Sequence, residues 1–132
     1  MAFFRDLFYA RRRSAPRVAA DWMVDLAVPN TDPQHWVGLF ATDLSTEGIR
    51  LRGLDSAQIR RLIDRIERVQ MKLRLPGMRP PLPQVIAELR WGLGDDANFS
   101  TGWRFAEIDA QTLRIIDAYI ADHPQDLIVD PV

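Results

Sequence analysis

Apolar and polar residues alternate with a period of two over six stretches of the chain. This period is typical of β-strands, in which successive side chains point to opposite faces. The six stretches cover residues 18–28, 36–42, 49–52, 69–75, 85–91 and 99–108. Clusters of Pro, Gly, Asn and Asp separate the first three, which predicts short antiparallel strands joined by turns. Six such strands favour a closed or nearly closed barrel, which leaves few strand edges exposed.

A helical period replaces the alternation in three other segments. Aromatic and aliphatic residues at helical spacing predict a short amphipathic helix within residues 1–10. An apolar stripe preceded by the capping residue Asp55 predicts a helix inserted at about 55–67. Asp109 caps a further helix near the C-terminus, which ends at His123 because Pro124 follows it.

The length of 132 residues suits one domain with its own core. We therefore expect an N-terminal segment over 1–10, a barrel domain over 11–123 and a tail over 124–132. No apolar run approaches the roughly 20 residues of a membrane span. The N-terminal apolar residues precede the positive charges and lack a cleavage-like segment, so no secretory signal is predicted. A cytoplasmic location is the expectation.

Charge and composition exclude several functional classes. The net charge of −1 does not favour a DNA or RNA partner. Cysteine is absent, which excludes disulfides and thiolate metal sites. His35 and His123 are the only histidines, and both are expected on the surface. No nucleophile–base pair or metal-ligand set can be assembled, so we expect no catalytic residue, no metal and no cofactor.

Arginine dominates the basic residues and gathers in one short stretch. Of 17 basic residues only Lys72 is lysine, which leaves 16 arginines. For those scattered along the chain, a GC-rich genome is the expected cause. The stretch RRRSAPR at 11–17 contains the pair Arg13 and Arg17, and Pro16 disfavours a helix there. A second pair with this spacing, at 61 and 65, falls inside the predicted helix, where a solvated face is expected.

A polar turn follows the second predicted strand. The sequence DLSTEG at 43–48 supplies Asp43 and Ser45 as hydrogen-bonding groups, and Gly48 permits a tight or positive-φ turn. Taken alone, this stretch is typical of an ordinary Asx turn. Together with Arg13 and Arg17, the stretch indicates a binding site. Arginines bind phosphate and guanine O6/N7, and a carboxylate accepts hydrogen bonds from the Watson–Crick edge of guanine. The two stretches together suit a small anionic guanine nucleotide.

With RSAPR at 13–17 and DLSTEG at 43–48 in this order, the sequence resembles the PilZ domain family, which binds cyclic di-GMP. The family is marked by R-x-x-x-R before the first barrel strand and [D/N]-x-S-x-x-G after the second. Stretches 48–52, 69–76, 85–91 and 102–109 also resemble its strands. The resemblance implies a mainly β fold: a six-stranded antiparallel barrel with a C-terminal helix. The helix predicted at about 55–67 departs from the common family pattern.

The resemblance also implies roles for individual residues. Arg13 and Arg17 would contact phosphates and guanine bases, Asp43 and Ser45 would hydrogen-bond a guanine, and Gly48 would shape the turn. Arg12 stands where a basic residue in some relatives favours an intercalated ligand dimer. The implied function is a cyclic di-GMP-binding effector, without catalysis, that changes conformation to regulate a downstream protein.

Two other functions stay open alongside the nucleotide receptor. A protein-interaction adaptor with the same fold would bind no nucleotide, although its motifs are usually degraded. A binder of single-stranded nucleic acid is disfavoured by the near-neutral charge and by the lack of an aromatic and basic stripe. A homodimer, formed for instance through the inserted helix, is also an open alternative.

Overall fold

The computed structural model describes residues 2–4, 15–53, 68–94 and 99–128. The helix predicted at 55–67 and the arginines at 11–13 lie outside these residues. Within them the chain forms strands, one α-helix and one short 3-10 helix. The mainly β fold class is therefore confirmed.

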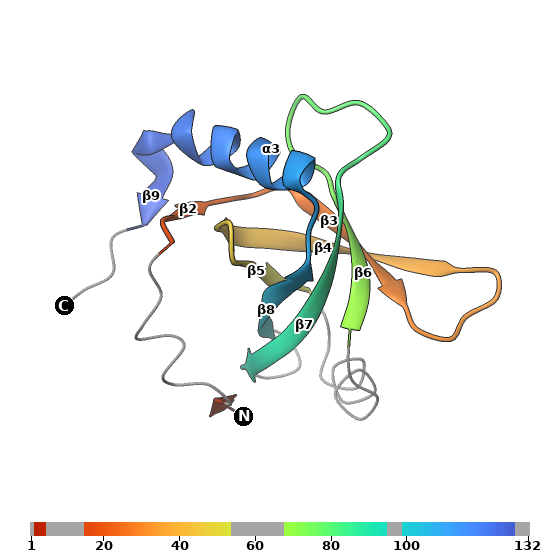
Figure 1. Cartoon of the computed structure of the whole chain (residues 1–132). Coiled ribbons are helices and arrows are strands. Elements are labelled where there is room, and N and C mark those ends of the chain that lie inside the picture. The colour runs from red at the N-terminus through yellow and green to blue at the C-terminus, as the bar shows by residue number, and fades with distance from the viewer. Residues whose placement is uncertain (1, 5–14, 54–67, 95–98, 129–132) are drawn as a thin grey trace.

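Six strands close into an antiparallel barrel (Figure 1). In spatial order these are β3 (Met23–Val28), β6 (Arg68–Leu73), β7 (Gln84–Leu93), β8 (Ser100–Glu107), β5 (Gly48–Arg52) and β4 (His35–Leu44), and β4 pairs back to β3. The predicted six-stranded barrel is confirmed. Their inner side chains form one core that includes Val24, Leu26, Leu51, Met71 and Leu73.

The predicted strand over 18–28 is broken in two, β2 (Arg17–Ala19) and β3. Both pieces pair with β4, but Ala19 lies opposite Asp43 and Met23 lies opposite Phe40. Between these two pairs the chain advances four residues from Ala19 to Met23 but only three residues along β4. Regular pairing with β4 therefore cannot continue from β2 into β3. Alternation in the sequence does not reveal this break, because the apolar positions keep their period across it.

Two short strands extend the sheet beyond the barrel. β9 (Leu127–Ile128) pairs with β2, so β2 lies between β9 and the end of β4. β1 (Ala2–Phe4) pairs with β7 at 91–93, beyond the part of β7 that pairs with β6. This free edge of β7 explains why residues 2–4 form a strand instead of the start of the predicted helix.

The C-terminal helix α3 (Ala110–Ala121) lies across one end of the barrel (Figure 1). Its Ile116 is fully buried in the core, and Tyr119 accepts a hydrogen bond from Trp22 Nε1 at 3.2 Å. Leu113, which the helical pattern places on the inner face, is instead 36% exposed. No helix within the described ranges is long and apolar enough to span a membrane.

The helix begins after the capping residue Asp109, and a short 3-10 helix and a strand follow it. Asp109 Oδ1 accepts the Thr112 N–H at 2.7 Å, which satisfies one of the free donors of the first turn. This interaction with the backbone lowers the pKa of Asp109. The chain then passes through a short 3-10 helix, η1 (Pro124–Asp126), into β9. Leu127 and Ile128, which belong to the expected tail, thus join the sheet.

Candidate functional site

A small pocket of about 60 Å³, open to solvent, lies against the outer surface of β5 and β8. Its lining residues come from five strands and the turn between β4 and β5: Arg17, Asp43, Ser45, Gly48, Ile49, Arg50, Arg90, Trp91, Gly102 and Trp103. Four of them are residues that the sequence analysis selected. The pocket therefore brings Arg17 together with Asp43, Ser45 and Gly48.

Asp43 is the buried acidic group of this pocket, with only 6% of its surface exposed. Two arginines approach the same carboxylate oxygen, Oδ2: Arg17 Nη1 at 3.5 Å and Arg50 Nε at 3.4 Å. Both distances exceed the roughly 2.7–3.2 Å of a good N–H···O hydrogen bond. The carboxylate is neutralised by its neighbours, yet it is held by them loosely.

The turn after Asp43 is held by Ser45 and fits closely against β8. Ser45 Oγ accepts the N–H groups of Glu47 at 3.0 Å and Gly48 at 3.2 Å. A Cβ at position 48 would lie 2.2 Å from the carbonyl oxygen of Trp103. Close approach of the backbones therefore requires glycine here, and Gly48 is not among the glycines with positive φ.

The structure adds Arg50 and Trp91, which the sequence analysis did not select. The Arg50 guanidinium carbon lies 5.0 Å from the centre of the Trp91 ring, a cation–π arrangement. The indole also covers Gly102, where a Cβ would lie only 2.2 Å from it. One signal could have revealed Arg50: it lies two positions after Gly48 on the same strand, and so on the same face.

Trp91 reaches the pocket because β7 contains a bulge. Leu89 lies opposite Trp103 and Trp91 lies opposite Gly102, so Arg90 has no counterpart on β8. An extra residue reverses the facing of the side chains that follow it. The alternation over 85–91 predicts that Trp91 faces inward with Leu89, and this prediction is wrong for that reason.

β4 contains a similar irregularity beside Asp43. Ala41 pairs with Leu51 and Asp43 pairs with Arg50, so Thr42 is the extra residue. Asp43 therefore lies directly across from Arg50, the cation that contacts it. Both walls of the pocket thus depend on a one-residue slip in a strand, a device that is frequent next to functional sites.

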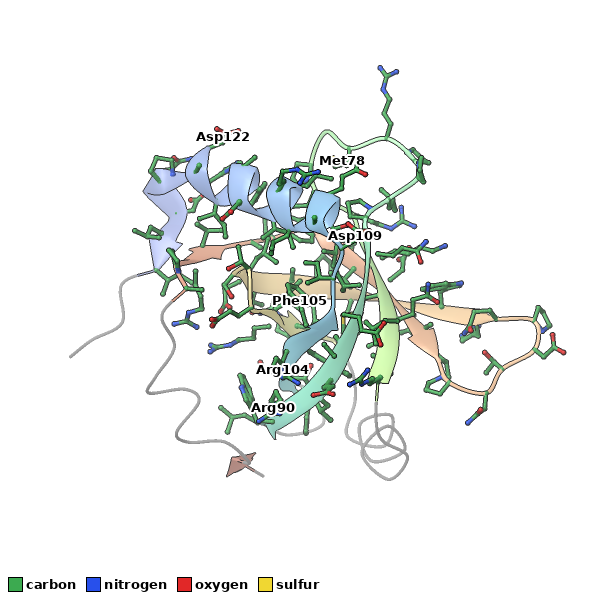
Figure 2. The ribbon with its side chains drawn as sticks, viewed as in Figure 1. Met78, Arg90, Arg104, Phe105, Asp109 and Asp122 are labelled. Atoms are coloured by element: carbon green, nitrogen blue, oxygen red, sulfur yellow. The ribbon has the colours of Figure 1, made fainter. Side chains whose placement is uncertain are left out.

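A second carboxylate, Glu88, is the centre of an arginine cluster beside the pocket. Figure 2 shows Arg90 on β7 and Arg104 on the neighbouring β8, toward the end of the barrel away from α3. Arg104 Nη2 donates to Glu88 Oε1 at 2.8 Å, and Arg68 Nε donates to Oε2 at 3.2 Å. Arg90 Nη1 lies 3.9 Å from Oε1. The hydrogen bond from Arg104 is the main cause that lowers the pKa of Glu88.

The remaining candidates take no part in the described site. Arg12 and Arg13 lie outside the described residues, and their contacts with a ligand stay predictions. His35 is exposed, and the His123 ring stacks on Tyr119 at 4.0 Å. Among the residues that the structure describes, no three His, Cys, Asp or Glu side chains gather as a metal-ligand set.

Comparisons with known proteins support the fold. No family model matches the sequence, and no curated protein matches it either. Among solved structures, the motility inhibitor MotI/DgrA of Bacillus subtilis matches 86% of this chain with a TM-score of 0.66 and 18% identity. Escherichia coli YcgR in complex with c-di-GMP matches the same share with a TM-score of 0.57 and 16% identity. The PilZ domain of YcgR with c-di-GMP also matches 86%, with a TM-score of 0.54 and 14% identity.

The extent of these matches differs between the whole proteins and the isolated domain. The chain spans 52% of MotI/DgrA and 46% of YcgR, but 92% of the isolated PilZ domain. The common part is therefore the domain and not the whole architecture of the longer proteins. The fold of this chain is of the PilZ type.

Proposed function

We propose that this chain, whose fold is of the PilZ type, is a receptor domain that binds cyclic di-GMP in the pocket on the outer surface of β5 and β8. One observation carries the proposal. Arg17 and Asp43 come from the two motifs and lie 3.5 Å apart, in a pocket that Ser45 and Gly48 also line. Two of the structurally similar proteins are complexes with c-di-GMP, which supports the same ligand.

The chemistry of the pocket matches the two parts of this nucleotide. A guanine presents N1–H and N2–H donors on its Watson–Crick edge, and the Asp43 carboxylate is a suitable acceptor for them. The ligand phosphates are anionic, and Arg17 offers a planar fork of donors that suits phosphate or guanine O6/N7. Arg13 and Arg12, from the segment that precedes β2, complete the proposed set of cations, and Arg12 favours a ligand dimer.

The domain itself carries out no chemistry under this proposal. Binding alters the β2 region, and a downstream protein in the cytoplasm responds to the changed surface. β2 suits this role, because Arg17 contacts the ligand site while the same strand pairs with β9. The partner is regulated because it binds the nucleotide-free and nucleotide-bound forms of the domain with different affinities.

Isothermal titration with cyclic di-GMP tests the proposal. The wild-type chain should bind at micromolar concentration or below, and Arg17→Ala should weaken binding at least tenfold. Arg79→Ala is the matched control, because Arg79 is exposed in the loop between β6 and β7 and carries the same charge. No binding at tens of micromolar would overturn the proposal. Capture of a partner that ignores the nucleotide would favour the adaptor function instead.

A further inference from the structure

Arg50 makes two contacts at once in the pocket, one with a carboxylate and one with an aromatic ring. Its Nε lies 3.4 Å from Asp43 Oδ2, and its guanidinium carbon lies 5.0 Å from the centre of the Trp91 ring. We propose that Arg50 occupies the place of the guanine edge in the ligand-free protein and must leave when the nucleotide binds. This inference rests on the proposed function and adds an internal competitor to it.

The guanidinium group is a chemical counterpart of the guanine edge. Both are flat, both present N–H donors side by side in one plane, and both pair with a carboxylate. Both also stack on an indole face, the guanidinium as a cation and the base as an aromatic ring. Asp43 and Trp91 therefore recognise Arg50 with the features by which they would recognise guanine.

Exposure identifies which arginine gives way. The Asp43 side chain is only 9% exposed, so its carboxylate has little room for a third donor. The Arg17 side chain is 12% exposed and belongs to β2, which pairs with strands on both edges. The Arg50 side chain is 40% exposed. Because Arg50 can return to water at low cost, it is the group that guanine displaces.

Removal of Arg50 should consequently strengthen the binding of cyclic di-GMP. A partly exposed ion pair and a partly exposed cation–π contact together correspond to about a three- to tenfold change in affinity. The gain should depend on the guanine edge. Adenine lacks the paired N1–H and N2–H donors, so cyclic di-AMP should gain nothing when Arg50 is removed.

Titration calorimetry on wild-type, Arg50→Met and Arg52→Met proteins separates this effect from general charge. Arg52 lies two residues further along β5, is exposed and is absent from the pocket lining. Each variant removes one positive charge from the same strand face. We expect Arg50→Met to bind cyclic di-GMP about three- to tenfold more tightly and Arg52→Met to bind equally or slightly more weakly. Thermal melting checks that both variants are folded.

A weaker Arg50→Met variant would overturn the inference and leave the proposed function intact. Arg50→Lys sharpens that outcome, because lysine keeps the charge but not the planar fork. If Lys restores binding that Met loses, Arg50 attracts the anion and does not compete with it. If neither wild type nor Arg50→Met binds, both the function and the inference are wrong.

NMR of the arginine Nε–H groups supplies a direct readout. In the free protein the chemical shift of the Arg50 Nε–H should reflect the nearby Asp43 carboxylate and Trp91 ring. Saturating cyclic di-GMP should move this signal toward that of a solvated arginine, whereas cyclic di-AMP should not. An Arg50 signal that stays unchanged in the saturated complex would contradict displacement.

Discussion

Two carboxylates on the outer side of this barrel are surrounded by arginines, but they are held in different ways. Glu88 accepts hydrogen bonds at 2.8 and 3.2 Å from Arg104 and Arg68, and its side chain is 24% exposed. The Asp43 side chain is 9% exposed, yet its two arginines stand at 3.4 and 3.5 Å. The more buried carboxylate is thus the one with the looser partners.

This difference indicates that the ion pairs of Glu88 stabilise the fold, whereas those of Asp43 can be replaced by contacts with a ligand. Charge-assisted hydrogen bonds of normal length use the acceptor capacity of Glu88 and tie β6, β7 and β8 together. A buried carboxylate with long ion pairs gains less from its partners while it stays shielded from water. Asp43 can therefore exchange an arginine for a better-fitting donor at small cost, which a binding site requires.

The largest effect should come from truncating each carboxylate in turn. Asp43→Ala removes the acceptor for the guanine edge and should weaken cyclic di-GMP binding about a hundredfold or more. Glu88→Ala should change the affinity by less than about threefold, because Glu88 only orders its neighbours. Titration calorimetry measures both. Equal losses of affinity in the two variants would show that the two carboxylates do not differ in role. The affinity of Asp43→Asn should fall between those of the two variants, because the amide oxygen still accepts one hydrogen bond.

A smaller effect should follow from disturbing the turn beside Asp43. Gly48→Ala places a methyl group against the Trp103 carbonyl, which belongs to the backbone and cannot rotate away. We expect a loss of about 1–3 kcal/mol in the free energy of unfolding, measured by urea denaturation. Gly38→Ala on β4 is the control, since there the obstacle is the flexible end of Met23 at 2.8 Å. A Gly48→Ala variant as stable as Gly38→Ala would contradict the close fit.

The smallest effect concerns the titration of Glu88. Its pKa is lowered in the folded chain, so its contribution to stability is present above the ordinary glutamate pKa and is lost as pH falls through the lowered value. Arg104→Met should raise the Glu88 pKa back toward its ordinary value, because the main hydrogen bond is gone. Carboxyl NMR during an acid titration follows the change. Arg79→Met should leave this pKa unaltered, and an ordinary pKa in the wild type would refute the assignment.

The sequence was sufficient to predict the barrel and four of the ten residues that line the pocket. Alternation identifies strands because burial of one face repeats every second residue. Asp43, Ser45 and Gly48 lie within six residues of one another, so a single β4–β5 connection places them together. Arg17 was also predictable, because Pro16 and the strand that follows place it outside a helix. These features depend on residues that are close together along the chain.

Features that depend on register were not predictable. The bulges at Thr42 and Arg90 carry no glycine or proline, so nothing in the residue types marks them. Each slip nevertheless decides which side chains reach the pocket, as the outward-facing Trp91 shows. The contact between Arg50 and Trp91 joins two strands whose neighbour β8 lies between them. The pairing of β8 with β5 on one side and with β7 on the other brings that pair together.

The pairing of the two terminal strands has a practical consequence for sensor design. β1 pairs with β7 beside Trp91, and β9 pairs with β2 beside Arg17. Each terminal strand is therefore fastened to one wall of the same pocket. Energy transfer between fluorophores attached to β1 and β9 would report the distance between these two walls. The domain could therefore serve as a ligand sensor without circular permutation of its sequence.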